Sequence, residues 1–220
     1  MTLEKLQEKT DKLLVFDKNS LKLLEKNDNN LNANLKYWLK SGDLVALKNG
    51  VYVFRAKYNH ETNKNEYLEY LANKLLTPSY LSLEYVLDKY SLLSESARAI
   101  TSISAKASRE FSNSLGVWRY YFLSKKLFLG YKTKYFKDQA IFEASKAKAL
   151  FDFLYLRFRR GVLPSEKGFL DLRLNLENLS KEDWSEFFSY FKLVPTNRFQ
   201  ELKRIIEKYS IQNKKPLKAI

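Results

Sequence analysis

The sequence predicts an α+β protein, with short helices and a hairpin in its first 55 residues and a larger part in which helices flank a small antiparallel sheet. Three observations predict this fold class. Apolar residues recur at helical spacing in several segments, Asn49-Gly50 joins two β-prone segments, and residues 99–143 are rich in β-branched and aromatic side chains. With 45% hydrophobic residues, the 220-residue chain can bury a core of its own.

The first 55 residues predict three short helices before the hairpin. Partial leucine stripes, one beginning at Leu3 and one at Leu21, indicate the first two helices. The polar residues 27–30 favour a turn, because short side chains compete for backbone hydrogen bonds. A third helix is expected from Leu31 to Gly42. Its apolar face comprises Leu31, Leu35, Trp38 and Leu39.

The hairpin is expected to pair residues 43–48 with residues 51–54. Asn49-Gly50 between them is the preferred sequence of a two-residue hairpin turn. Three helices followed by a hairpin is the element order of a winged helix-turn-helix domain. An αα-hairpin that only packs on the rest of the protein is the alternative.

The outward face of the third helix favours DNA binding over simple packing. It carries a small residue for close approach, amides that can hydrogen-bond to base edges, and cations for phosphates. These candidate DNA-binding residues are Asn32, Ala33, Lys36, Tyr37 and Lys40, and Lys48 and Asn49 in the hairpin are expected to touch an adjacent phosphate.

Residues 66–220 predict a larger domain, separated from residues 1–55 by a polar linker at 56–65. The linker contains His60, the single histidine, which we expect to be a solvated loop residue rather than a metal ligand or catalytic group. Two helices are expected before the predicted strands, and more helices after them. Four acidic residues of the first two helices, Glu66, Glu69, Glu84 and Asp88, have the spacing of an ordinary solvent face.

Positive charge is concentrated between residues 98 and 137, which carry a net charge of +8 out of +14 for the chain. Because aromatic residues lie between these cations, we expect a surface for an acidic partner. The candidate partner-binding residues are Arg109, Arg119, Lys125, Lys126, Lys132 and Lys134, with Lys148 and Arg157 from the next helix. The alternatives are a scaffolding pair of Lys148 with Asp152, and a favourable interaction of Arg157 with the helix dipole.

Residue types that common enzyme sites require are missing. The chain has no cysteine, which excludes thiol nucleophiles, Cys-based zinc sites and disulfides, and favours a cytoplasmic protein. It contains no phosphate-binding glycine loop, no G-x-S-x-G elbow, no H-E-x-x-H helix and no Asp-x-Asp pair. Neither a secretory signal nor a transmembrane helix is expected. We therefore expect a protein that is not an enzyme and that uses no cofactor or metal.

Four segments resemble, in order and spacing, the AbiEi-type antitoxins of bacterial toxin–antitoxin systems. They are LNANLKYWLKSGDLVALKNGVYVF (31–54), LTPSYLSLEYVLDKYSLL (76–93), ITSISAK (100–106) and FEASKAKALFDFLYL (142–156). The first resembles the winged-helix segment of the family, the second its "psYiSleSAL" helix pair, and the last its "peKALlDllyl" helix. Here Ala147 stands where the family often has Glu, and Tyr85-Val86 departs from the usual Ser-Ala.

The resemblance implies a two-part antitoxin of an abortive-infection (phage-defence) system. The winged helix would bind promoter double-stranded DNA as a transcriptional repressor, and the larger domain would counteract a cognate nucleotidyltransferase toxin, directly or indirectly. The alternative is a stand-alone winged-helix regulator with a ligand-sensing or dimerisation domain. An enzyme that acts on nucleic acid, with the basic and aromatic sheet as its platform, ranks third.

Overall fold

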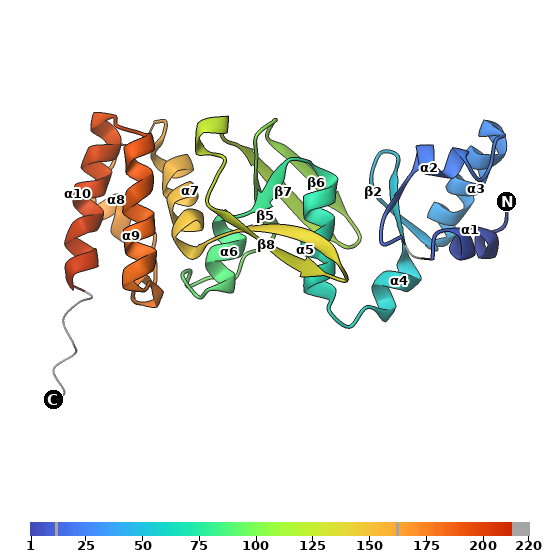
Figure 1. Ribbon diagram of the computed structural model, residues 1–220, viewed down its shortest axis with the longest axis horizontal. Helices are drawn as coiled ribbons and strands as arrows, with labels where there is room; N and C mark the ends of the chain where they lie inside the picture. The colour runs from blue at the N-terminus through green and yellow to red at the C-terminus, as the bar shows by residue number, and fades with distance from the viewer. Residues whose placement is uncertain (12, 162, 213–220) are drawn as a thin grey trace.

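A computed structural model describes residues 1–11, 13–161 and 163–212 (Figure 1). The molecule is elongated: the N-terminal helices form one end, a β-sheet lies in the middle, and the C-terminal helices form the other end (Figure 1). Most strands follow one another in β5–β9 (residues 100–144) and most later helices in α7–α10 (residues 146–212), and this mixed helix and strand content confirms the α+β fold class.

The N-terminal unit contains three helices and a three-stranded antiparallel sheet. Its elements are α1 (Leu3–Lys9), β1 (Phe16–Asp17), α2 (Lys18–Lys22), α3 (Asp28–Ser41), β2 (Leu44–Lys48) and β3 (Val51–Phe54). The strand order is β1-β3-β2. The hairpin turns at Asn49-Gly50, as predicted; Gly50 has a positive φ of 74°, and the strand register shifts between Ala46 and Lys48. The two-residue strand β1 has no counterpart in the sequence prediction.

Helix α3 begins three residues earlier than the predicted start. Asn27 is its N-cap, and the Asn27 side chain accepts hydrogen bonds from the backbone N–H groups of Asn29 (3.0 Å) and Asn30 (3.1 Å). The prediction of a turn at 27–30 was therefore wrong: the short polar side chains satisfy the free amides of a first helical turn. The end of the helix at Gly42, with a φ of 84°, is as predicted.

The segment predicted as a linker is mostly helical. Helix α4 (Arg55–His60) covers its first half, and α5 (Lys64–Leu75) begins before its end. The Lys57 Nζ donates to the backbone carbonyls of Thr10 (3.1 Å), Asp11 and Leu13 (3.2 Å). A segment that looks polar and aperiodic in the sequence thus serves as packed structure, because its lysine satisfies the carbonyls that follow α1.

The larger unit is built on a six-stranded mixed sheet. Its strands are β4 (Ser79–Leu81), β5 (Ile100–Ser104), β6 (Arg109–Asn113), β7 (Gly116–Phe122), β8 (Tyr131–Phe136) and β9 (Gln139–Ala144). The order is β6-β7-β5-β4-β9-β8, with parallel pairing of β5 with β7 and of β4 with β9. The sheet is thus larger than predicted and not purely antiparallel, because β7 lies between β5 and β6, which are consecutive in the sequence, and because β4 joins it.

Helices cover this sheet and extend the molecule toward the C-terminus. They are α5, α6 (Leu83–Lys89), α7 (Lys146–Phe158), α8 (Glu166–Leu170), α9 (Lys181–Ser189) and α10 (Asn197–Gln212), with 3-10 turns at Lys125–Leu127, Leu176–Asn178 and Tyr190–Leu193. Aromatic rings join α7 to the 3-10 turn that follows α9: the Phe151 ring lies 5.3 Å from that of Tyr190 and 5.6 Å from that of Phe191. In the described part of the chain, no helix has both the length and the apolar character that a membrane span needs.

Two hydrophobic clusters form the core, and the hairpin contributes to both. Leu44, Tyr52 and Phe54 belong to the small N-terminal cluster. Val45, Leu47 and Val53, which alternate with them, belong to the large cluster of the second unit. The units are also tied by hydrogen bonds from Arg55 Nη2 to Ser114 Oγ (2.7 Å) and from Asn113 Nδ2 to the Leu47 carbonyl (3.3 Å). The two units are therefore packed against each other and are not joined through residues 56–65 alone.

Candidate nucleic-acid interface

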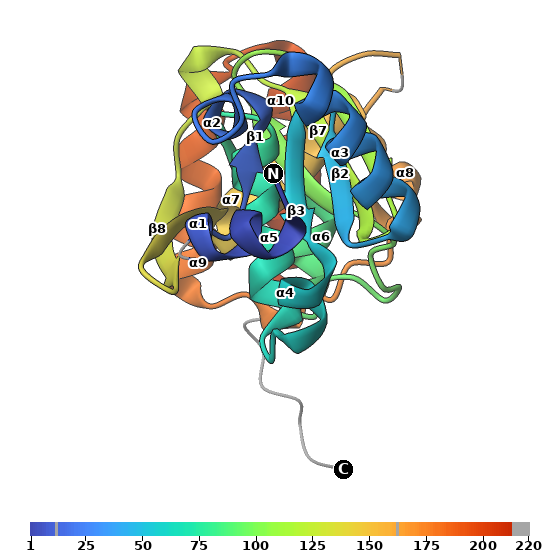
Figure 2. The same ribbon diagram turned by 90° about the vertical axis from the view of Figure 1, so that its right-hand side faces the viewer.

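Helix α3 lies at the free end of the molecule. Figure 2 views this end, with α1, α2 and α3 facing the reader. Leu31, Leu35 and Trp38 are buried against the small core, which fixes the rotation of the helix about its axis. The opposite face is consequently directed to solvent.

The predicted DNA-binding residues of α3 share this exposed face. Asn32, Ala33, Lys36, Tyr37 and Lys40 are all exposed, and 67% of Tyr37 is accessible. The earlier start of the helix adds Asn29, one turn before Ala33 and also exposed. Among the described residues, neither Lys36 nor Lys40 forms an ion pair. The face therefore presents amides, an aromatic ring and two unpaired cations over about three helical turns.

Two neighbouring residues are placed differently from the prediction. Asn34, which flanks this face in the sequence, is half-buried and donates from Nδ2 to the Met1 carbonyl at 3.1 Å. Leu39, predicted on the apolar face, is 36% exposed. The apolar stripe of α3 is therefore narrower than predicted.

Lys48 does not extend this surface as predicted. Its Nζ donates to the Leu75 carbonyl at 2.6 Å and lies 5.8 Å from the centroid of the Phe111 ring. The reason is that the hairpin packs on the larger unit, so that Lys48 caps the last turn of α5. Asn49 is exposed at the hairpin tip.

The cations predicted to form one partner surface lie on opposite sides of the large sheet. Arg109 and Arg119 belong to β6 and β7 at one edge, and Lys132 and Lys134 belong to β8 at the other. Five strand spacings of about 4.8 Å separate these edges, on the order of 24 Å. Lys125 and Lys126 are exposed in the connection between β7 and β8. The predicted single basic surface was wrong, because strand order and not sequence order decides which cations are neighbours.

Two members of this set are already paired within the protein. Arg119 Nε donates to Glu110 Oε2 at 2.8 Å. Lys134 Nζ lies 2.5 Å from Glu69 Oε2 and 2.6 Å from Glu143 Oε2, and Lys89 contacts the same two carboxylates at 3.0 and 2.8 Å. Glu69 is buried, so the predicted solvent face was wrong for this residue. Burial opposes ionisation of Glu143, but hydrogen bonds from Lys134 and Lys89 prevail and lower its pKa.

Lys148 is a core residue, not a partner-binding one. It is 1% exposed and forms an ion pair with Asp152, which is fully buried. Tyr80 (2.9 Å) and Ser82 (2.8 Å) donate to Asp152 Oδ2, and the Lys148 Nζ lies 5.4 to 5.6 Å from the ring centroids of Tyr80, Phe151 and Tyr190. The four-residue spacing of Lys148 and Asp152 therefore belongs to a buried polar network. Arg157, by contrast, is exposed near the end of α7.

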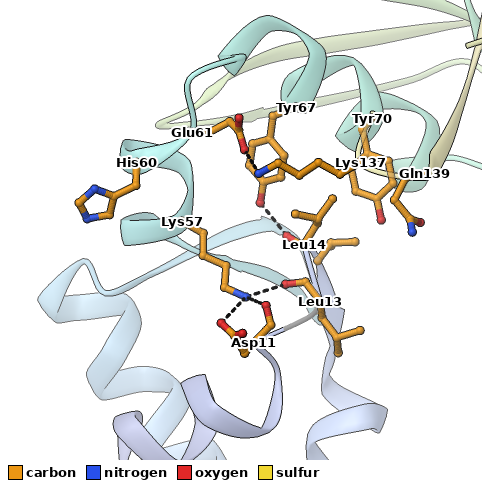
Figure 3. A pocket seen from close by; sticks show the side chains of 11 residues that line it. Asp11, Leu13, Leu14, Lys57, His60, Glu61, Tyr67, Tyr70, Lys137 and Gln139 are labelled. Atoms are coloured by element: carbon orange, nitrogen blue, oxygen red, sulfur yellow. Dashed lines mark hydrogen bonds and ion pairs between the residues drawn. The ribbon is translucent and has the colours of Figure 1, made fainter. Parts of the chain in front are cut away.

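A pocket of about 430 Å³ lies where the two units meet (Figure 3). Lys57 of α4 and Tyr67 of α5 reach to backbone carbonyls of the N-terminal unit, the Tyr67 hydroxyl donating to the Leu14 carbonyl at 2.6 Å. Glu61 pairs with Lys137 at 2.5 Å on its wall. His60 is exposed and points away from these residues (Figure 3). The charged groups of this pocket are therefore already engaged in contacts within the protein.

Within the described ranges, no three side chains of the types that ligate metals come together at one place. No family model matches the chain, and no curated protein matches it.

Proposed function

We propose that this protein is a DNA-binding repressor and antitoxin, in which residues 1–55 act as a winged helix-turn-helix domain. The observation that carries the proposal is the exposed face of α3, where Lys36 and Lys40 point to solvent beside Tyr37 and the asparagines. Amides suit base edges in the major groove, and lysines suit phosphates. Cytoplasmic location accords with the absence of cysteine and is part of the proposal.

The element order of the N-terminal unit supports this assignment. Three helices, a short strand before the second helix, and a hairpin after the third correspond to the order expected for a winged helix. The packing of the hairpin on the second unit limits its part in binding to the tip at Asn49. DNA binding in the proposal therefore rests on α3.

The antitoxin half of the proposal rests on the resemblance of the four segments given above. The partner would be a nucleotidyltransferase toxin, counteracted by direct contact or by an opposing effect on its target. Five of the predicted partner-binding cations remain candidates for such contact, because they are exposed and form no ion pair among the described residues. They are Arg109, Lys125, Lys126, Lys132 and Arg157. Because they do not form one surface, contact would involve one sheet edge rather than the whole set.

Promoter binding tests the first half. In a mobility-shift titration, Lys36→Ala with Lys40→Ala should weaken binding to the upstream DNA and reduce the slope of log affinity against log salt by about 0.9 per lost phosphate contact. Lys192→Ala, which removes an exposed lysine near the other end of the chain, is the matched control. Unchanged affinity and slope in a folded double variant would refute the assignment of α3.

Co-expression with the toxin tests the second half. Substituting Lys125, Lys126 and Lys132 by Gln should leave promoter binding intact and reduce the rescue of growth. Substituting Arg109 of β6 and Arg157 of α7 by Gln provides a second variant, placed elsewhere on the larger unit. Full rescue by both variants would exclude these cations from toxin contact.

A regulator that senses a ligand is the second candidate function. The observation that favours it is a cleft of about 900 Å³ in the larger unit, which is within the size range of small-molecule sites. Normal growth of cells that express the adjacent gene without this protein would favour this candidate over an antitoxin.

A further inference from the structure

The cleft in the larger unit has walls that are fixed by hydrogen bonds. It lies between the loop at residues 93–99, strands β5 and β7, the end of α7, and the segment after α8. The Ala97 N–H donates to Asp88 Oδ2 at 2.8 Å, and the Ser94 hydroxyl donates to the Arg173 carbonyl at 2.9 Å. An isolated bridge between Leu93 and Leu174 joins the two loops. The cleft is therefore preformed, so that a ligand need not order its walls.

Four arginines line this cleft: Arg98, Arg119, Arg157 and Arg173. They come from four separate elements, and three carboxylates, Glu84, Glu95 and Asp171, lie among them. Arg119 is held by Glu110. In the described part of the chain the other three arginines are exposed and make no ion pair. Guanidinium groups with free donors suit a phosphate, which can accept two parallel hydrogen bonds from each.

Glu84 presents an unmet hydrogen-bonding requirement in the same cleft. Its Oε2 is buried and has no hydrogen-bond partner among the described residues. A buried carboxylate oxygen without a donor is costly, so a ligand that brings a hydroxyl or amine would be favoured there. A fully ionised anion such as acetate or sulfate brings no such group.

The remaining walls suit a flat ring. Tyr121 on β7 and Phe153 on α7 line the cleft and are half-buried. Burial, with the charge of Glu84 adding to it, raises the pKa of the Tyr121 hydroxyl, which keeps this ring neutral. Neutral aromatic rings stack on nucleobases, which supports binding of any base.

We propose that this cleft binds a nucleoside phosphate, with the phosphate held by the arginines, a sugar or base donor on Glu84, and the base against Tyr121 and Phe153. The ligand is either a free nucleotide or the terminal nucleotide of an RNA, which offer the same groups. This site is separate from α3 and does not depend on the proposed repressor function. It gives the larger unit a ligand of defined chemistry.

Calorimetric titration of the full-length protein with AMP, inorganic phosphate and a short single-stranded RNA with a terminal phosphate tests the proposal. AMP should bind more tightly than inorganic phosphate, and binding by the RNA alone would identify the RNA end as the source. Arg98→Gln and Arg157→Gln should each weaken AMP about tenfold. Arg160→Gln, an exposed arginine just after α7 and outside the cleft lining, should not.

Glu84→Ala distinguishes a nucleoside phosphate from an anion. This variant should lose affinity for AMP and keep its affinity for inorganic phosphate. Amide chemical shifts of residues 93–99 should move with AMP in the parent protein, which locates the site even if a variant does not fold. No heat and no shift changes at millimolar AMP or RNA, or equal affinity for AMP and phosphate, would overturn the proposal.

The nucleotide-binding proposal and the DNA-binding proposal can be tested separately. Lys36→Ala should retain AMP binding, and Arg98→Gln should retain promoter binding.

Discussion

The N-terminal unit and the larger unit use their basic residues differently. Lys36 and Lys40 lie on α3 without an ion pair among the described residues, whereas Lys134 bridges two carboxylates and Lys148 is enclosed in the core. In the sequence the larger unit has the denser run of positive charge. The difference shows that a high density of lysines and arginines in the sequence does not imply that these side chains are free to bind a partner, because some of them form ion pairs within the fold.

The two units also share the β2–β3 hairpin, so no boundary along the chain separates their cores cleanly. Alternate residues of the β2–β3 hairpin enter the small and the large core. The N-terminal unit therefore contains a contrast of its own: the outer face of α3 is free, whereas the β2–β3 hairpin is shared with the larger unit. The following predictions test it, from the largest expected effect to the smallest.

Removing residues 1–62 should destabilise the remainder severely. The deletion removes Val45, Leu47 and Val53 from the large cluster, and each buried aliphatic side chain contributes about 1.5–3 kcal/mol. We expect residues 63–220 to be poorly soluble or to unfold at lower urea concentration than the full chain. A soluble, monodisperse fragment with the stability of the full chain would show that the units are independent.

Lys148→Ala should reduce the free energy of unfolding by about 3–5 kcal/mol, because it leaves the buried Asp152 unpaired. Urea denaturation followed by circular dichroism measures this loss. Lys148→Met with Asp152→Leu should recover most of it, since neither charge then remains buried. A Lys148→Ala protein as stable as the Lys192→Ala control would contradict the role assigned to the pair.

Lys134→Ala should lower the stability of the protein, whereas Lys36→Ala should lower its affinity for the promoter. Lys134→Ala removes charged hydrogen bonds to Glu69 and Glu143 and should reduce stability by about 1.5–3 kcal/mol without changing promoter affinity. Lys36→Ala should leave stability within about 0.5 kcal/mol and weaken promoter binding. Urea denaturation measures the stability of both variants, and a mobility-shift titration measures their promoter affinity. If both variants lost the same property, the proposed difference between the two lysines would be wrong.

Acid should weaken the network around Glu143. The folded pKa of Glu143 lies below its ordinary value of 4.5, so its contribution to stability is fully present above that value and is lost as the pH falls through the lower, folded pKa. Glu143→Gln should therefore flatten the fall in stability below pH 4.5. Urea midpoints measured from neutral to acidic pH check this, and parallel curves for the two proteins would argue against it.

The hairpin, the end of α3 and its polar face could be predicted because each depends on local chemistry. Asn49-Gly50 determines the turn, Gly42 ends the helix, and Leu31, Leu35 and Trp38 fix the face that is buried. The start of α3 was wrong, since an asparagine run suits both a turn and an N-cap.

Local patterns could not predict the strand order, nor which lysines are exposed and which form ion pairs in the fold. Pairing of β5 with β7 and of β4 with β9 joins segments that are not adjacent strands in the sequence. One signal was present: residues 44–47 and 51–54 are apolar almost without alternation, which is typical of strands buried on both faces. That signal, interpreted correctly, predicts that the hairpin lies between two cores.

The two edges of the large sheet differ in a way that limits self-association. The N-terminal hairpin lies against β6, with Asn113 of β6 bonded to Leu47, whereas β8 pairs only with β9 among the described strands. Antiparallel joining of β8 to β8 of a second copy would follow a twofold axis and use up the open edge of both copies. Assembly through β8 would thus stop at a pair. Lys132 on β8, which is exposed and forms no ion pair among the described residues, opposes even that step, because like charges would approach each other across the join.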